Sequence, residues 1–273
     1  MDPMSNVPVL ILAGGLGTRI SEETHMKPKP MIEIGDHPIL LHIMRYYYNH
    51  GFNDFVICAG YRSWEIKDYF LNYKYRQSHM MIDHRDSMCD PVEIGTHAPQ
   101  EKWRVRVVDT GLETMTGARV AKALDVISET DSFENFAVTY GDGLTGACLR
   151  EEFDFHLEHG KIGTVLGVPP LSRFGEMDIS DEGSVTAFLE KPEAKTGLIN
   201  GGYFFFKKAF RNYLTTTTSC ILERDPLQKL AADKQLKVHE YRGFWQCMDT
   251  LRDKNHLQSI WDSGEAPWRP NVL

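Results

Sequence analysis

A continuous apolar stretch near the start of the chain, Val7-Pro-Val-Leu-Ile-Leu-Ala13, runs directly into Gly14-Gly-Leu-Gly-Thr-Arg19. Such a run suits a strand that is buried on both faces, as the strands of a parallel sheet are. Apolar residues then recur at helical spacing over 38–50, in a strand pattern over 54–59 and at helical spacing again over 64–73. Because parallel strands are joined by crossover helices, this alternation predicts an α/β fold with a mostly parallel central sheet and helices on both of its faces.

The same alternation continues toward the C-terminus. Strands are expected over 104–108, 136–139, 164–168 and 237–241, and helices over 119–127, 151–159, 226–234 and after Asp249. Two apolar stretches within 185–206 predict antiparallel strands, and the polar tract 75–102 predicts a long excursion or a small hairpin. No linker-like change in composition divides the chain, so residues 1–6 are expected to form a disordered leader and residues 7–273 a single domain.

Composition excludes several classes of protein. With 273 residues, 42% hydrophobic and 25% charged, the chain matches an ordinary globular protein and not a disordered one. A net charge of −8 argues against a nucleic-acid binder, and the first apolar run is far shorter than the ~20 residues of a membrane span. The five cysteines form no Cys-x-x-Cys pair, which favours reduced thiols. We therefore expect a cytoplasmic protein without nucleic-acid or membrane partners.

The glycine-rich segment 14–19 is the first candidate for chemistry. Its glycines allow a ligand to approach the backbone closely, and successive amides can bind an anion. A phosphate-binding loop of the Walker type would need a Lys after Gly17, and a dinucleotide fingerprint would need a glycine where Ile20 stands. Taken alone, a glycine-rich loop of this kind is best interpreted as a turn without a ligand. Arg19 and the nearby Lys27-Pro-Lys-Pro30 favour a basic clamp for a polyphosphate, because flanking prolines restrict the backbone of Lys29.

Two aspartates are candidates for holding a metal ion. Asp142 lies in Tyr140-Gly-Asp-Gly143 at the end of a predicted core strand, and ligands of parallel α/β sheets bind beyond the carboxyl ends of the strands. A carboxylate there suits Mg²⁺, although an Asp-Gly pair is also a common surface turn. Asp249 opens the last predicted helix, where it is an N-cap, a second ligand for the same ion, or both.

Weaker motifs accompany these residues. Glu190-Lys-Pro192 fits either a ligand-binding ion pair or a surface one, and Asn200-Gly-Gly202 fits either a ligand contact or a tight turn. Asp109-Thr-Gly111 and Met115-Thr-Gly117 either wall a base pocket or form two further turns. No Gly-x-Ser-x-Gly motif occurs, and no Ser or Cys has a recognisable partner base, so covalent hydrolysis has little support.

Six motifs follow one another in order: the glycine loop with Thr18-Arg19, Lys-Pro-Lys-Pro, Tyr-Gly-Asp-Gly, Glu-Lys-Pro, Asn-Gly-Gly and Met-Asp-Thr. From about Val9 to the C-terminus this series resembles the sugar-1-phosphate nucleotidyltransferases. Further stretches resemble the branch that uses CTP: Ser21-Glu-Glu-Thr24, Val108-Asp-Thr-Gly111, Met115-Thr-Gly117, Gly243-Phe-Trp-Gln246 and Asp249-Thr-Leu-Arg-Asp253. The tract 78–102 and the run 215–219 carry no part of this resemblance.

The resemblance implies a Rossmann-like nucleotidyltransferase fold of GT-A type with a small antiparallel insertion. It implies transfer of a cytidylyl group from CTP to α-D-glucose 1-phosphate, giving CDP-glucose and pyrophosphate, with Mg²⁺ as cofactor. The product would supply precursors of 3,6-dideoxyhexoses for the O-antigen of lipopolysaccharide. The sugar phosphate would attack the α-phosphorus of CTP directly, in line with the departing pyrophosphate.

Carried over by position, the resemblance also implies roles for individual residues. Arg19, Lys29 and Asp142 would be catalytic, and Asp142 and Asp249 would hold the magnesium. The nucleotide would be bound by Leu12, Ala13, Gly14, Gly15, Leu16, Gly17, Thr18, Arg19, Lys29, Thr110, Met115 and Gly141, with Thr110 and Met115 by the base. The sugar phosphate would be bound by Gly175, Glu190, Lys191 and Asn200.

Several alternatives stay open at this point. The same chemistry could use UTP or dTTP, or CTP with another phosphorylated partner. A non-catalytic paralogue that binds nucleotide sugars would be expected to lose Lys29, Asp142 or Asp249, and a GT-A-like glycosyltransferase would be expected to carry Asp-x-Asp where Tyr140-Gly-Asp-Gly143 stands. The resemblance further implies a homo-oligomer, such as a hexamer, and residues 46–48 and 203–206 could supply either its apolar contacts or ordinary core packing.

Overall fold

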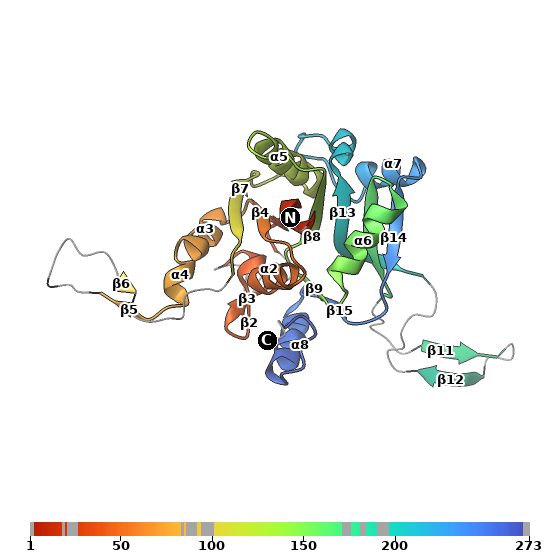
Figure 1. The fold of residues 1–273 in the computed structure, drawn as a ribbon. Coiled ribbons are helices and arrows are strands. Elements are labelled where there is room, and N and C mark those ends of the chain that lie inside the picture. The colour runs from red at the N-terminus through yellow and green to blue at the C-terminus, as the bar shows by residue number, and fades with distance from the viewer. Residues whose placement is uncertain are drawn as a thin grey trace.

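A seven-stranded sheet forms the centre of the computed structural model, which describes residues 3–17, 20, 27–82, 85, 92–93, 101–170, 176–180, 184–189 and 197–269. Its strands lie in the order β14 (Leu236–Glu240), β10 (Gly163–Val168), β13 (Ile199–Lys207), β8 (Asn135–Tyr140), β1 (Val9–Ala13), β4 (Asp54–Ala59) and β7 (Arg104–Asp109) (Figure 1). β1 pairs in parallel with both β4 and β8, and β13 runs antiparallel to its neighbours β8 and β10. The predicted mostly parallel sheet is confirmed.

Helices cover both faces of this sheet. The described helices are α2 (Ile39–Asn49), α3 (Ser63–Leu71), α4 (Tyr73–Arg76), α5 (Thr116–Ser128), α6 (Leu149–His159), α7 (Asp225–Ala232) and α8 (Leu251–Asp262). Alternate side chains of β1 enter two different clusters: Val9 and Ile11 pack with α2 and α6, and Leu10 and Leu12 pack with α5 and α7. Because both faces are covered, β1 is apolar throughout and fully buried.

Among the described residues, four small antiparallel strand pairs accompany the main sheet. They are β2 (Glu33–Ile34) with β3 (His37–Pro38), β5 (Met80–Met81) with β6 (Val92–Glu93), β9 (Gly143–Thr145) with β15 (Trp245–Cys247), and β11 (Glu176–Ile179) with β12 (Val185–Leu189). Figure 1 shows the β5–β6 and β11–β12 hairpins standing away from the sheet on opposite sides. These pairs provide the predicted antiparallel insertion, and β5–β6 provides the predicted hairpin within 75–102.

One helix begins earlier than its sequence pattern indicates. The prediction places it at 119–127, but α5 begins at Thr116. The amide of Met115 donates to the Thr218 carbonyl at 2.8 Å, and the amide of Ala118 donates to the Cys220 carbonyl at 3.1 Å. A segment distant in sequence therefore satisfies amides at the start of the helix, which no local pattern can indicate.

One expectation about packing is wrong for the residues described, and one open alternative is decided. Residues 3–6 were expected to belong to a disordered leader, but Pro3–Asn6 form the 3₁₀-helix η1, and the Met4 side chain is buried in the core cluster around β1 and α2. By sequence alone, the aromatic runs at 46–48 and 203–206 fit either intersubunit contacts or core packing. Tyr46, Tyr47 and the four aromatic side chains 203–206 are buried within the chain, so they form core packing.

Within the described part, no helix combines the length and the apolar character needed to cross a membrane.

Glu152 is a buried acid in this core. It lies on α6 and is fully buried, and neither of its carboxyl oxygens has a hydrogen-bond partner in the described part of the chain. Burial raises the pKa of this carboxyl from its ordinary value of 4.5 to about 8. Between about pH 4.5 and about pH 8, the Glu152 carboxyl of the folded protein therefore keeps a proton that the same carboxyl of the unfolded chain has lost. The free energy of unfolding therefore falls as pH rises, by about 5 kcal/mol over the whole window.

The substitution Glu152→Gln should remove this dependence because the amide stays neutral. Urea unfolding at about pH 5 and about pH 8 should show the variant gaining stability relative to wild type as pH rises. Glu158→Gln, at an exposed position of the same helix, is the control. If wild type and Glu152→Gln depend on pH equally, the buried carboxyl does not carry its proton through this range.

Candidate active site

The direction of the strand connections reverses beside β1. From β1 the chain proceeds through α2 to β4 and on to β7, and then returns through α5 to β8 on the other side of β1. At such a switch point the loops that follow the two central strands turn apart and leave room for a ligand. The glycine-rich segment follows β1 and Asp142 follows β8, so the sequence-predicted phosphate and metal residues lie at this point.

The glycine-rich segment leaves the sheet through a tightly packed turn. Leu12 and Ala13 end β1 and Gly14 is buried, whereas Gly15 and Leu16 are exposed. Gly17 has a φ of 64°, a left-handed conformation that glycine adopts without a steric cost. Thr18 and Arg19, which were predicted to bind the nucleotide, lie outside the described residues. The described part of the loop thus presents exposed backbone next to the end of β1.

Lys29 lies at the centre of a charged cluster. It begins the short 3₁₀-helix η3 (Lys29–Met31) between Pro28 and Pro30, and its Nζ lies 2.5 Å from Oδ2 of Asp142 and 2.7 Å from Oδ1 of Asp249. Burial lowers the pKa of Lys29, but the two carboxylates outweigh burial and hold that pKa above its ordinary value. The side chain is therefore an ammonium, and the cluster as a whole carries one net negative charge.

Backbone pairing brings the two aspartates together. β9 and β15 pair antiparallel, with Gly143 opposite Cys247, and the amide of Met248 donates to the Asp142 carbonyl at 2.8 Å. Asp249 lies just before α8, whose N-cap is Thr250 in a capping box with Asp253. The interpretation of Asp249 as the N-cap itself is therefore wrong, and its carboxylate reaches Lys29 instead.

Gly141 lies at the meeting point of three segments. Its amide donates to the Leu12 carbonyl at 3.0 Å, so the ends of β1 and β8 are joined there. A Cβ at this position would lie 2.8 Å from the Leu12 oxygen and 2.9 Å from Cγ of Pro30. The absence of a side chain at Gly141 thus lets the turn that contains Lys29 and Pro30 pack against the segment between β8 and Asp142.

The two residues predicted to lie by the base, Thr110 and Met115, lie near the end of β7 and the start of α5, away from the Lys29 cluster. Thr110 is buried after β7 and its Oγ1 donates to the Ala59 carbonyl at 2.6 Å, whereas Met115 is half exposed at the start of α5. Between them lies Arg119, whose guanidinium is almost fully buried. It donates to the carbonyls of Ala59, Gly111, Leu112 and Gly14 and to Oγ1 of Thr110. Arg119 therefore connects the segments that follow β1, β4 and β7.

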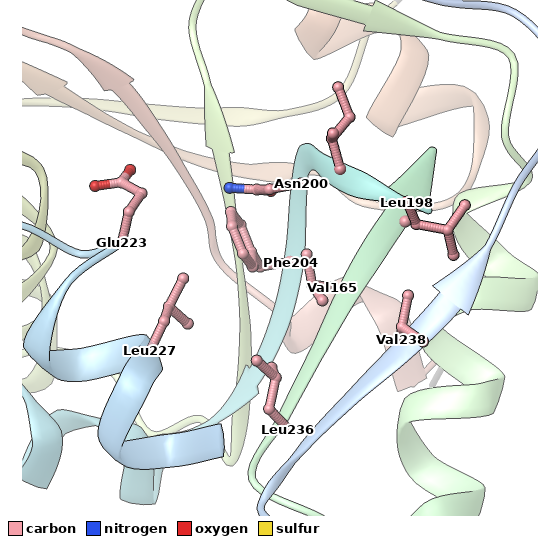
Figure 2. Close-up of a pocket in the computed structure, with 10 residues that line it drawn as sticks. Val165, Leu198, Asn200, Phe204, Glu223, Leu227, Leu236 and Val238 are labelled. Atoms are coloured by element: carbon pink, nitrogen blue, oxygen red, sulfur yellow. The ribbon is translucent and has the colours of Figure 1, made fainter. Parts of the chain in front are cut away.

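Asn200 lies on the other side of the site, at the start of β13. It borders a cavity of about 270 Å³ between β10, β13, β14 and α7 (Figure 2). The polar side chains of this cavity are Asn200 and Glu223, and its apolar lining includes Val165, Leu198, Phe204, Leu227, Leu236 and Val238. Gly175, Glu190 and Lys191, which were predicted to bind the sugar phosphate with Asn200, lie outside the described residues.

The structure thus joins Lys29, Asp142 and Asp249 in direct contact, and next to Asp142 it packs Gly141 against the Leu12 carbonyl and Pro30. Thr110 and Met115 lie toward β7 and α5, and Asn200 lies toward β10 and β13. Sequence analysis alone does not identify Arg119 or Glu223. Each is a single charged residue without a local motif, and its position is evident only from contacts across the fold.

A nucleotide site at the switch point of a mostly parallel sheet is typical of a large class of α/β proteins. A family model described as nucleotidyl transferase matches residues 8–250, so the chain belongs to the nucleotidyl transferase family. The resemblance read from its motifs is confirmed. Glucose-1-phosphate cytidylyltransferase of Salmonella typhi is 42% identical to this chain over 260 residues, which are 95% of this chain and 98% of the relative. A Bacillus subtilis protein, named as a probable glucose-1-phosphate cytidylyltransferase, is 35% identical over the same shares.

Solved structures agree with the fold. A UDP-glucose pyrophosphorylase in complex with UDP-glucose superposes with a TM-score of 0.66 at 16% identity, covering 94% of this chain and 99% of that one. The similarity at this level of identity concerns the architecture alone. The predicted nucleotidyltransferase fold is confirmed.

The packing around Gly141 yields a test of the site. Gly141→Ala places a methyl group against backbone and a proline ring, so the end of β8 and the Lys29 turn must move apart. Nucleotidyl transfer should then fall about 10²-fold in kcat, as expected when reacting groups shift by about 1 Å. The matched control is Gly143→Ala, where a Cβ meets nothing within 4 Å. Equal activity in the two variants would contradict the packing argument.

Proposed function

We propose that this chain transfers a cytidylyl group from CTP to α-D-glucose 1-phosphate, giving CDP-glucose and pyrophosphate. The observation that carries the proposal is the Lys29 ammonium held between Asp142 and Asp249 beside the glycine-rich segment, in a member of the nucleotidyl transferase family. The identity to proteins named glucose-1-phosphate cytidylyltransferase supports the choice of nucleotide and sugar.

The reaction requires two anions to meet. A phosphate oxygen of the sugar phosphate attacks the α-phosphorus of CTP, and a new P–O bond forms there as the bond to the β-phosphate oxygen breaks. The bonding electrons leave with pyrophosphate. The attacking phosphate is largely ionised at neutral pH, so no side chain has to remove a proton from it. Catalysis then consists of positioning the two substrates and stabilising charge, which requires cations and amide donors and no nucleophilic side chain.

Lys29 is suited to the charge-stabilising role. An ammonium has three N–H donors, of which two point to Asp142 and Asp249, so the third can donate to a phosphate oxygen. The ion pairs keep the group protonated by holding its pKa above the ordinary value. The partly buried position strengthens its attraction for phosphate relative to bulk water. We assign Arg19 to the same role from the family resemblance.

Enzymes of this family generally use a divalent metal ion, and we propose Mg²⁺ held by Asp142 and Asp249. Their carboxylate oxygens already converge on one ammonium, and Mg²⁺ is commonly bound by one or two carboxylates together with substrate phosphates. Among the residues described, no group of three or more His, Cys, Asp or Glu side chains could hold a metal, so substrate phosphates are assigned the other positions. When bound, the ion would reverse the net negative charge of the cluster and neutralise phosphate charge.

The remaining assignments follow the family resemblance. The nucleotide is placed along residues 12–19, with Thr110 and Met115 by the base. Gly141 is placed next to the nucleotide, where the ends of β1 and β8 are joined. The sugar phosphate is assigned to Asn200 together with Gly175, Glu190 and Lys191. The presence of Lys29, Asp142 and Asp249 in mutual contact disfavours a non-catalytic nucleotide-sugar-binding paralogue. UTP and dTTP are the competing nucleotides for the same chemistry.

We also propose that residues 7–273 act as a single domain, in the cytoplasm and as part of a homo-oligomer. The four cysteines that the structure describes are unpaired, which supports a reducing, cytoplasmic location. Exposed apolar side chains on α3 and around β5, including Trp64, Leu71 and Met81, support a homo-oligomer, with a hexamer as the size expected from the resemblance. CDP-glucose would be used for 3,6-dideoxyhexoses of the O-antigen.

The direct test is pyrophosphate release with glucose 1-phosphate and Mg²⁺, run in parallel with CTP, UTP, dTTP, ATP and GTP. Release that depends on both CTP and the sugar phosphate is the expected result. Preferred use of another nucleotide would retain the mechanism and overturn the assignment of the base. No release with any of the five would overturn the proposed reaction.

Lys29→Ala is expected to lower kcat about 10³-fold, because a cation that stabilises the transition state is lost. Unfolding in urea should stay cooperative, since η3 keeps both of its prolines. Lys27→Ala is the matched control: Lys27 lies in the same Lys-Pro-Lys-Pro motif but is half exposed and paired with Glu33. Near-normal turnover of Lys29→Ala would refute the role given to this ammonium.

A further inference from the structure

A chain of hydrogen bonds connects Glu223 to Asn200 through Tyr140. The Tyr140 hydroxyl donates to Oε1 of Glu223, and Nδ2 of Asn200 donates to the Tyr140 oxygen at 3.3 Å. The other carboxylate oxygen of Glu223 accepts from Oγ1 of Thr116 at 2.8 Å. The four residues come from the start of α5, the turn before α7, the end of β8 and the start of β13. This chain therefore links the predicted sugar side of the site to β8, the strand that Asp142 follows.

Glu223 sets the direction in which the Tyr140 hydroxyl donates. An ionised carboxylate can only accept hydrogen bonds, so Tyr140 must be the donor toward it. A tyrosine hydroxyl has one hydrogen, and the Tyr140 oxygen must therefore accept from its other neighbour. The group of Asn200 that faces Tyr140 is consequently the amide nitrogen and not the amide oxygen.

The amide of Asn200 is fixed from both ends. Its Oδ1 accepts from the amide of Gly202 at 2.8 Å while its Nδ2 donates to Tyr140. Figure 2 shows the amide nitrogen directed toward the side of the cavity on which Glu223 lies. One of the two N–H groups of Nδ2 is used by Tyr140, so the other can donate to an oxygen of a ligand. Asn200 is exposed and can make that contact.

Close packing reinforces these hydrogen bonds. Gly202 has a φ of 79°, and a Cβ there would lie 2.4 Å from Cδ2 of Tyr140. The Asn200-Gly-Gly202 segment of β13, for which the sequence also allowed a tight turn, is therefore part of a strand and rests directly on the tyrosine ring. Nε1 of Trp245 donates to the Gly201 carbonyl at 2.7 Å and holds this segment of β13 from another direction. A change in the position of the Tyr140 ring must then move the backbone next to Asn200.

We propose that Glu223 is a positioning residue for the sugar phosphate: through Tyr140 it orients the Asn200 amide so that an N–H donor faces a sugar hydroxyl or phosphate oxygen. This inference rests on the proposed function, in which Asn200 contacts the sugar phosphate. Without the carboxylate, the Tyr140 hydroxyl could point its hydrogen toward Asn200 and no longer accept from Nδ2, so that the Gly202 amide alone would hold the Asn200 side chain. The N–H donor that faces the ligand would then lose one of its two fixed contacts.

The test is a double-mutant cycle with Glu223→Gln and Tyr140→Phe. Each single variant should raise KM for glucose 1-phosphate about tenfold, the loss expected for one misplaced hydrogen bond to a charged substrate, with KM for CTP unchanged. If Glu223 acts through Tyr140, the double variant should be no worse than Tyr140→Phe alone. Additive losses would overturn the inference, because Glu223 would then act independently of the tyrosine.

Asp225→Asn is the matched control, since it removes an exposed carboxylate two residues away at the start of α7. It should leave both KM values at wild-type levels. A purely structural role of Glu223 would lower urea stability and affect both substrates alike, which contradicts the proposal. An active wild type with an unchanged KM for glucose 1-phosphate in Glu223→Gln refutes this inference alone. A wild type that releases no pyrophosphate from CTP and glucose 1-phosphate refutes the proposed function itself.

Discussion

The ion pairs of Lys29 with Asp142 and Asp249 hold together segments that are 113 and 220 residues apart in the chain. The three side chains are only 13–25% exposed, and partly buried charges lose hydration that their partners must replace. A pair of apolar side chains could fill the same space without that cost. The cluster is therefore better explained by the chemistry it supports than by stability. It keeps a protonated cation at the one edge of the sheet where strand connections reverse.

The backbone around this cluster holds it independently of the charges. The β9–β15 pairing and the bond from Met248 to the Asp142 carbonyl place both aspartates before any side chain is considered. The capping box of Thr250 and Asp253 fixes the first turn of α8, so the residue before it has a defined direction. Lys29 depends on its flanking prolines in the same way. Positioning through rigid backbone agrees with a reaction that needs alignment more than it needs a reactive side chain.

Local pattern was sufficient for most of the fold. β4 begins and ends where its apolar run does, at Asp54 and Ala59, because a strand buried on both faces leaves a continuous signal. The β9–β15 pair was missed because strands of three residues show no periodicity and find their partner far away in the sequence. In the site, Lys29 and Asp142 were found through flanking prolines and a strand end. Arg119 and Glu223 have no such markers, because contacts made only after folding define their surroundings.

The adjacent residues Gly14 and Gly15 of the glycine-rich segment have different surroundings. The motif was read as a loop that lets an anion approach the backbone, and Gly15 fits this reading because it is exposed and a Cβ there would meet nothing within 4 Å. A Cβ on Gly14 would instead lie 2.0 Å from Nη1 of Arg119, whose guanidinium donates to the Gly14 carbonyl. Gly14 is thus required by the fold, whereas Gly15 lies on the exposed side, where a ligand can reach the backbone. Since Arg119 also binds the ends of β4 and β7, it holds the loop from inside and leaves the Gly15 side open to a ligand.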